Sequence, residues 1–280
     1  MKPIHLILIC FFAAGSIYSQ IGEQKFPIDY TETTGELTSK DIYKSDFGRY
    51  KGFEIELYEG ETLNVVLYST SFQPALALID PKGNVYKQNT GDAKGYSSIL
   101  TTIPTTGNWI VYIIGTKNAA GKYVLQTAIA EPSSLKLDLD ADFCTTMDYL
   151  IAHSTAYFYL LENGQKNQKR AVKIPGSAES FYDAEDGSYN SLMYAGNDSA
   201  SCEAAFRNIF SNIKECIDKK WSNVSSNWKK TNEILEKNTL WSEDTSQKPR
   251  FVKISIYDLQ NFSRKPKNRF EIYIQINRKR

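Results

Sequence analysis

Residues 52–86, GFEIELYEGETLNVVLYSTSFQPALALIDPKGNVY, decide the fold of the first part of this chain. Phe53, Ile55 and Leu57 alternate with polar residues, which is typical of a strand with one buried face. A glycine turn and two further apolar runs follow. The segment 80–84, Asp-Pro-Lys-Gly-Asn, is a strong turn because proline fixes φ and glycine accepts a positive φ. The stretch therefore predicts short antiparallel strands joined by tight turns.

The same pattern continues to residue 131. Further strands are expected at 98–103, 109–114 and 122–129, with a Pro-Thr-Thr-Gly turn between the first two. No part of this region has a helical period. Short strands with turn signals at this spacing predict an all-β, jelly-roll-like sandwich over residues 20–131.

The order of these motifs resembles the bacterial pre-peptidase C-terminal (PPC) domain over residues 24–131. The motifs that carry the resemblance are Phe53-Glu54-Ile55, Gly60-Glu61, Ser71-Phe72-Gln73-Pro74, Asp80-Pro81-Lys82-Gly83, Pro104-Thr105-Thr106-Gly107-Asn108-Trp109 and Gly121-Lys122-Tyr123-Val124-Leu125. The resemblance implies an exported accessory module that binds or assists and does not catalyse. Gln73 stands where the family often has an aspartate that can hold calcium, so no calcium site is predicted.

Three tyrosines of the predicted sandwich, Tyr86, Tyr96 and Tyr112, are candidate ligand contacts. Exposed tyrosine rings can form a platform on which a sugar stacks, with the hydroxyl left for hydrogen bonding. The alternative is that each ring fills a sheet face as an ordinary strand residue. In that case the sandwich is a spacer or a packing partner.

Residues 1–19 have the layout of a secretory signal peptide. Lys2 supplies a positive start, 4–14 is almost wholly apolar, and cleavage is expected after Ser19 or after Ser16. The apolar stretch is too short to span a bilayer, and no later run approaches the ~20 residues that a spanning helix needs. We therefore expect an exported protein, periplasmic or secreted, without a transmembrane segment.

Three cysteines, Cys144, Cys202 and Cys216, follow the expected cleavage sites. Cys202 and Cys216 lie on one predicted helix, about 20 Å apart by helical rise, so they cannot pair with each other. Any disulfide must therefore include Cys144, and three buried thiols are the alternative. The earlier Cys10 is not expected to carry a lipid, because Ile9 is not the small residue that lipoprotein processing requires.

A second domain, α+β in class, is predicted over residues 132–280, and Pro132 marks its start. The expected elements are helices at 141–162 and 199–221, a short strand at 171–174, a hairpin around Asp186-Gly187, and strands at 252–256 and 270–276. Residues 221–248 are polar and predict a long excursion with at most a helical turn at 233–237. Two helices would cover one face of an antiparallel sheet. This order is loosely similar to that of small chaperones of bacterial secretion systems.

Catalytic and metal-binding patterns are not evident. One histidine, His153, follows the signal segment, and it lies mid-helix, about 13 Å from Cys144 by helical rise. The remaining cysteines have no zinc spacing. Glu185 and Asp186 lie in a predicted turn, where acidic residues are common. We therefore predict no catalytic, metal or cofactor residues, although a pair of carboxylates can catalyse glycoside hydrolysis without any motif.

Basic residues gather near the C-terminus, although the net charge of the chain is only +1. Arg264, Lys265, Lys267 and Arg269 lie in a predicted hairpin loop and are candidate contacts to an anionic partner. The alternative is that they are solvated loop charges. Nucleic acid is not an expected partner of an exported protein.

These features predict an exported, non-catalytic binding protein whose sandwich recognises an envelope or extracellular polysaccharide or a protein. The alternative is an accessory or chaperone-like subunit that acts through the α+β domain. A hydrolase with an unrecognised carboxylate site is the third hypothesis.

Overall fold

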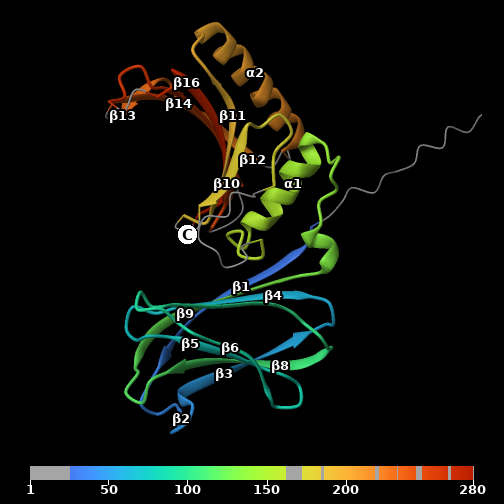
Figure 1. The fold of residues 1–280 in the computed structure, drawn as a ribbon, viewed down its shortest axis with the longest axis vertical. Helices are drawn as coiled ribbons and strands as arrows, with labels where there is room; N and C mark the ends of the chain where they lie inside the picture. Colours follow the sequence, from blue (N-terminus) through green and yellow to red (C-terminus); the bar gives the residue numbers. More distant parts are fainter. Residues whose placement is uncertain are drawn as a thin grey trace, which may run out of the picture.

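The computed structural model describes residues 26–161, 172–183, 186–217, 221–231, 233–243, 248–263 and 266–279. The predicted signal peptide precedes the described residues. The described chain is mostly β, with three sheets and two α-helices (Figure 1). None of the helices described is long and apolar enough to cross a membrane.

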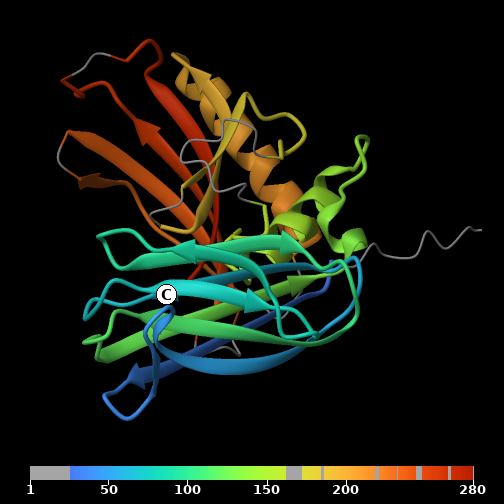
Figure 2. The same ribbon diagram turned by 60° about the horizontal axis from the view of Figure 1, so that its bottom comes forward.

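The first part of the chain is a sandwich of two antiparallel sheets. Its strands are β1 (Ile28–Leu37), β2 (Ile42–Lys44), β3 (Gly48–Leu57), β4 (Thr62–Tyr68), β5 (Ala75–Ile79), β6 (Val85–Thr90), β7 (Tyr96–Thr102), β8 (Gly107–Gly115) and β9 (Gly121–Ala130). The sheet orders are β1-β9-β4-β7 and β2-β3-β8-β5-β6. The chain crosses repeatedly between the two sheets, as in a jelly roll, and forms the hairpins β2–β3 and β5–β6 within the five-stranded sheet. The predicted all-β sandwich is present, and Figure 2 shows its two layers from below.

The sandwich core forms because alternate residues of the facing strands are apolar. Leu63, Leu76 and Trp109 are fully buried between the sheets. The Trp109 indole donates to the Thr105 carbonyl oxygen at 3.2 Å, so its polar atom is satisfied inside the core. The predicted turn at 80–84 is held by the Asp80 carboxylate, which accepts from the backbone N–H of residues 82 and 84. The turn chemistry of the sequence therefore sets the strand order directly.

The second part of the chain is a curved antiparallel sheet with two helices on one face (Figure 1). Its elements are the 3-10 helix η1 (Pro132–Leu135), α1 (Phe143–Ser154), β10 (Glu179–Asp183), β11 (Ser188–Gly196), α2 (Ser199–Cys216), β12 (Trp221–Ser225), β13 (Lys229–Thr231), β14 (Ile234–Glu243), β15 (Arg250–Asp258) and β16 (Phe270–Arg278). The sheet order is β10-β11-β16-β15-β14-β12, and β13 also pairs with β14.

Local sequence fixes where the helices begin and how they pack. Asp142 and Asp198 cap α1 and α2 by accepting from backbone N–H groups three residues later. Both helices bury apolar side chains against the isoleucines of β15 and β16. A disulfide joins Cys144 to Cys216 with Cα atoms 4.9 Å apart, and Cys202 is a buried free cysteine. The prediction that any disulfide includes Cys144 is confirmed.

Both predicted helices were too long. Helix α1 ends at Ser154 and not at residue 162, because Tyr157 and Phe158 take left-handed φ angles of 51° and 61°. Their rings turn away from the helix axis and become buried. Helix α2 ends at Cys216 and not at Trp221, because the next residue, Ile217, is extended.

The predicted polar excursion over residues 221–248 is wrong, because β12, β13 and β14 occupy most of it. In β14 only Thr239 and Trp241 are buried. Charged residues lie around them, so the sequence does not show the alternation of apolar and polar residues that is typical of a strand. A helical turn at 233–237 is absent from the described residues of that range. Val172–Ile174 is irregular and not the predicted strand, while Ala171 and Glu185 lie outside the described residues.

The two parts pack together where the chain leaves α1. Ala128 and Ala130 of the sandwich form a buried cluster with Ala156 and Leu160. The Asn64 side-chain amide donates to the Tyr159 carbonyl oxygen at 2.7 Å. We refer to residues 155–161 as the junction turn. The division into two domains at Pro132 stays a prediction.

Candidate functional site

The three candidate tyrosines of the sandwich lie in different surroundings. Tyr86 packs its ring edge against Trp109, with centroids 5.2 Å apart. Tyr96 pairs in register with Tyr68 on the outer face of the four-stranded sheet. Tyr112 packs against Tyr50 on the outer face of the five-stranded sheet, with centroids 4.8 Å apart. Because these are separate surfaces, the three rings do not form one stacking platform.

Of the four candidate basic residues, only Lys267 and Arg269 lie within the described part of the chain. Arg264 and Lys265 lie outside the described residues, and Lys267 is exposed. Arg269 makes two hydrogen bonds to the Asp258 carboxylate, at 2.9 and 3.0 Å, and stacks over Phe270. The bond from Arg269 outweighs burial and lowers the pKa of Asp258. Arg269 therefore closes the base of its loop.

The residues considered for catalysis are buried or bonded. His153 is fully buried, and one ring nitrogen, Nε2, lies 3.0 Å from the Ser134 carbonyl oxygen. Burial lowers the pKa of His153 to about 4, although the bond to Ser134 opposes the shift. Burial also raises the pKa of the Cys202 thiol to about 11. Within the described ranges, no three His, Cys, Asp or Glu side chains are placed to hold a metal ion.

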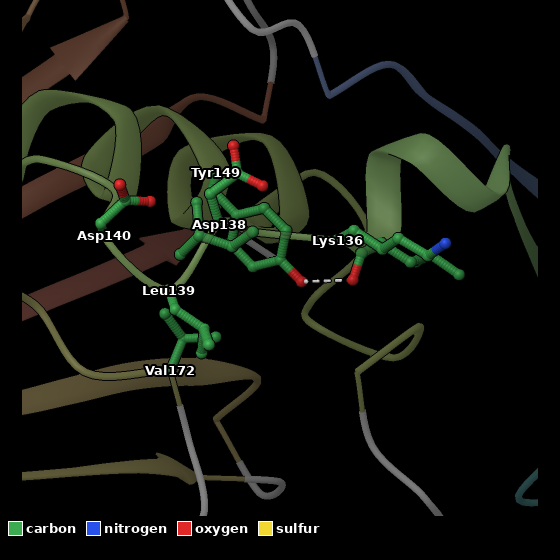
Figure 3. Close-up of a pocket in the computed structure, with 8 residues that line it drawn as sticks. Lys136, Asp138, Leu139, Asp140, Tyr149 and Val172 are labelled. Atoms are coloured by element: carbon green, nitrogen blue, oxygen red, sulfur yellow. Dashed lines mark hydrogen bonds between the residues drawn. The ribbon is translucent and has the colours of Figure 1, made fainter.

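A shallow hollow of about 690 Å³ lies beside the segment that connects η1 to α1 (Figure 3). Leu135, Leu137, Tyr149 and Val172 line it together with the exposed Leu139. The Tyr149 hydroxyl is already engaged, because it donates to the Leu135 carbonyl oxygen at 3.2 Å. Lys136, Asp138 and Asp140 also line the hollow, which is therefore of mixed apolar and charged character.

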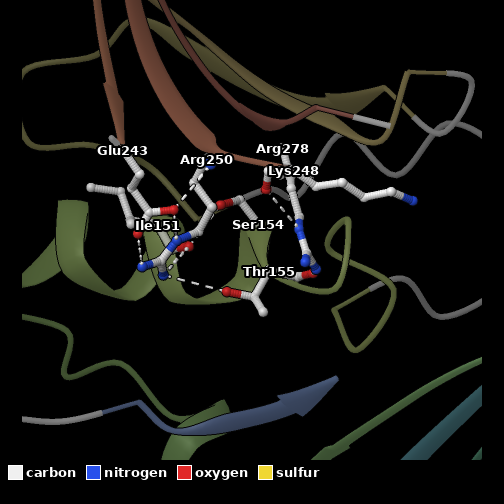
Figure 4. Close-up of polar contacts among 7 residues, drawn as sticks. All are labelled: Ile151, Ser154, Thr155, Glu243, Lys248, Arg250 and Arg278. Atoms are coloured by element: carbon white, nitrogen blue, oxygen red, sulfur yellow. Dashed lines mark hydrogen bonds and ion pairs between the residues drawn. The ribbon is translucent and has the colours of Figure 1, made fainter. Parts of the chain in front are cut away.

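Two arginines tie the ends of β15 and β16 to α1 and the junction turn (Figure 4). Arg250 pairs with Glu243 at 2.5 Å and donates to the Thr155 hydroxyl at 3.3 Å. Arg278 donates to the Thr155 carbonyl oxygen and lies over the Tyr30 ring of the sandwich, 4.7 Å from its centroid. Both arginines thus join segments that are far apart in the sequence, which is a structural role.

The seven-stranded sheet has one face that the helices leave uncovered. In β15 and β16 the isoleucines point to the helices, so the residues between them point the opposite way. We call this second face the open face. By strand register it carries Glu179, Phe181, Asn190, Leu192, Val224, Glu236, Asn238, Leu240, Lys253, Ser255, Tyr257, Glu271, Tyr273 and Gln275. Figure 1 shows both helices on the other side of the sheet.

A polar network organises the centre of the open face. The Glu236 carboxylate accepts from Lys253 at 2.7 Å, from Ser255 at 3.2 Å and from Asn238 at 3.3 Å. Burial acts to raise the pKa of Glu236, but these bonds outweigh it and hold the pKa below its usual range. Glu236 is therefore anionic at neutral pH and fixed in orientation. Because the charged and polar groups of this network bond to one another, their side chains hold one arrangement on the surface of the sheet.

Aromatic rings border this network. Tyr257 and Tyr273 pack edge to face with centroids 5.9 Å apart, and the Tyr273 hydroxyl donates to Glu271 at 3.0 Å. Phe181, at the β10 edge, is 39% exposed. Sequence reasoning missed this face because β14 was taken as a loop. The alternation of Lys253, Ser255 and Tyr257 with buried residues was the available signal.

Comparisons with known proteins give limited guidance. No protein-family model and no curated protein sequence matches the chain. Among solved structures, PliG, a periplasmic inhibitor of g-type lysozyme from Aeromonas hydrophila, is 12% identical, with a TM-score of 0.27 over 36% of this chain and 84% of that chain. The pre-peptidase C-terminal domain of a Bacillus anthracis collagenase is 15% identical, with a TM-score of 0.25 over 35% and 87% of the respective chains.

A third similar structure is the Yersinia pseudotuberculosis-derived mitogen, 20% identical, with a TM-score of 0.28 over 40% of this chain and 92% of that chain. Identities and scores this low carry no argument about function. Of the predicted resemblance to the PPC family, only a β-rich region is supported. Membership of that family stays a prediction.

Proposed function

We propose that this chain is an exported, non-catalytic accessory protein that binds a protein partner through the open face of its seven-stranded sheet. The open face carries the proposal. It combines one exposed aromatic ring, Phe181, and two partly buried ones, Tyr257 and Tyr273, with a charge network that is already paired, and the described helices do not cover it. Such a mixture of aromatic side chains and satisfied polar groups is typical of protein interfaces.

Export is supported by two independent features. Residues 1–19 have the composition of a signal peptide. The disulfide between Cys144 and Cys216 suits an oxidising compartment, where such bonds form and persist.

A non-catalytic role is supported by the state of the reactive side chains. His153 has no access to solvent, Cys144 and Cys216 are bonded to each other, and Cys202 is buried. A nucleophile or general base needs to reach a substrate atom within hydrogen-bond distance. None of these four side chains meets that condition in this fold.

The open face is a better candidate than the two surfaces favoured by the sequence. The sandwich tyrosines are dispersed over separate faces, so a common sugar platform has no geometric support. The apolar faces of α1 and α2 are buried against the sheet, so a client cannot be held there without unfolding. A chaperone-like function would have to use the open face as well.

The test uses residues 20–280 as immobilised bait for exported proteins, envelope polysaccharide and peptidoglycan from the source cell. Phe181→Asp changes the open face, and Tyr96→Asp is a matched control because the two side chains are 39% and 38% exposed. We expect a stoichiometric protein partner that is lost with Phe181→Asp and retained with Tyr96→Asp. Capture of a polysaccharide that only Tyr96→Asp weakens would assign function to the sandwich instead.

A further inference from the structure

The three sheets have six edges within the described chain, one of them shared by β12 and β13, and the other five are protected. Strand β1 carries Asp29, Glu32 and Glu36, β10 carries Glu179 and Asp183, and β2 has only three residues. Charges and short length are the usual means of preventing another strand from pairing with an edge.

Strands β6 and β7 protect each other across the open side of the sandwich. The β6 side chains of Lys87 and Asn89 donate to β7 carbonyl oxygens, at 2.6 Å to Leu100 and at 2.7 Å to Ser98. Two carbonyl oxygens that β7 would offer to a new strand are thereby occupied.

Strand β12 is the exception. Its sequence, Trp-Ser-Asn-Val-Ser, has no charge and no proline, and β14 is its only strand partner among the described elements. Two exposed large apolar residues lie on or beside this strand, Val224 at 65% within β12 and Trp228 at 42% in the segment between β12 and β13. A strand without charges of its own, next to exposed apolar side chains, can act as a template for strand addition, and the lysines of the adjoining β13 limit which strands fit.

The charge along the edge indicates what kind of strand fits. Residues 221–231 contain Lys229 and Lys230 and no Asp or Glu. Lys229 lies opposite Glu236 in the register, but that carboxylate is already paired with Lys253. A second copy of this chain would bring the same positive segment to the interface, which like-charge repulsion disfavours. An acidic segment would instead be attracted.

We propose that the β12 edge accepts an extended, acidic segment of a partner protein as an additional strand of the seven-stranded sheet. The segment forms main-chain hydrogen bonds with Trp221–Ser225, packs apolar side chains beside Val224 and Trp228, and places its acidic residues at Lys229 and Lys230. This proposal rests on the proposed function, because the added strand would widen the same open face that the partner contacts.

The probe is a fluorescein-labelled peptide of alternating valine and threonine that ends in two aspartates, and a matched peptide ends in two lysines. Binding to residues 20–280 is measured by fluorescence anisotropy at low and high salt. We expect the acidic peptide to bind at least about tenfold more tightly than the basic one, and the difference to shrink at high salt. No saturable binding of the acidic peptide up to roughly 1 mM overturns the proposal.

The variant Val224→Lys places a charge on the edge, and Val85→Lys is its control, because Val85 is a valine on edge strand β6 with 52% exposure. We expect about tenfold weaker peptide binding for Val224→Lys and less than about twofold for Val85→Lys. Equal effects of the two variants overturn the proposal. Circular dichroism is used to check that each variant is folded.

Amide hydrogen exchange of the unmodified protein tests the same point without a variant. The acidic peptide should protect residues 221–231 and leave β6 unchanged. Protection elsewhere overturns the proposal, and so does a concentration-dependent dimer with a protected β12, which would assign the edge to a second copy.

Failure of the edge proposal can be told from failure of the proposed function. If Phe181→Asp abolishes capture of the protein partner and Val224→Lys does not, the open face stands and the edge proposal fails. If neither variant changes capture of the partner, both fail.

Discussion

His153 illustrates how a single buried side chain sets the pH response of this protein. Its ring is enclosed, one nitrogen bonds to the Ser134 carbonyl oxygen, and the other, Nδ1, has no hydrogen-bond partner among the described residues. Protonation would put a charge in this enclosure. The folded pKa of about 4 is below the ordinary 6.5, so the unfolded chain binds the proton first as the pH falls.

We therefore predict that stability is fully present above about pH 6.5 and declines towards pH 4, by roughly 3 kcal/mol in total. Urea unfolding between pH 4.5 and 7.5 measures this directly. The variant His153→Gln should flatten the profile in this window, because Glu236, Glu243 and Asp258 have lowered pKa values and titrate at lower pH. An unchanged slope in the variant would assign the acid response to other groups.

At the scale of the element, the disulfide fastens the start of α1 to the end of α2. It closes a sequence separation of 72 residues, which includes β10 and β11. Closing a loop of this length stabilises the folded chain by about 4 kcal/mol in the chain-entropy account, because the unfolded state is restricted.

We predict that Cys144→Ser combined with Cys216→Ser lowers the free energy of unfolding by about 2–4 kcal/mol. Thiol titration of residues 20–280 should find no reactive thiol in the native protein, one after denaturation and three after denaturation with reduction. Reaction of the native protein with the reagent would show that Cys202 is accessible, contrary to its burial.

The elements that could be predicted from sequence are those whose signals are local. The turn at 80–84 and the strand around Trp109 follow from Pro, Gly and alternation, and each is present. The end of α1 could not be predicted, because Tyr157 leaves the helical conformation to reach Tyr30 and Arg278, which are far away in sequence. Strand β14 was missed because only the packed sheet shows which of its polar residues face solvent.

The candidate site likewise has features that the local sequence predicts and features that only the packed fold shows. Tyr86, Tyr96 and Tyr112 all lie on strands, although the predicted strand at 98–103 began after Tyr96, and their grouping depends on which sheet and which face each strand takes. The open face draws residues from β10, β11, β12, β14, β15 and β16, so its composition depends on a strand order that the sequence does not state. In the sequence, Lys253 and Tyr257 look like ordinary strand residues. Only the folded sheet places Glu236 beside Lys253 and Tyr273 beside Tyr257.

At the scale of the whole molecule, the junction turn links the sandwich to the seven-stranded sheet. Arg278 contacts the Tyr30 ring, the Tyr157 ring, at 5.8 Å from its centroid, and the Lys248 carbonyl oxygen at 3.3 Å. Lys248 in turn pairs with Glu32 of β1 at 2.7 Å. Arg278 thus joins β16, the last strand in the sequence, to β1, the first strand of the sandwich.

We predict that Arg278→Met lowers the free energy of unfolding by about 1–3 kcal/mol, through lost hydrogen bonds and lost ring contacts. Lys267→Met, at an exposed loop position, is the control and should change it by less than about 0.5 kcal/mol. Equal values for the two variants, measured by urea unfolding at pH 7, would contradict a stabilising junction.

The open face is the centre of this account, and photo-crosslinking tests it most directly. The full chain would be produced in its source cell with p-benzoylphenylalanine in place of Phe181 or, as the control, in place of Tyr96. The account predicts one discrete protein adduct from position 181 and none from position 96. An adduct from position 96 alone, or a polysaccharide adduct from either position, would contradict it.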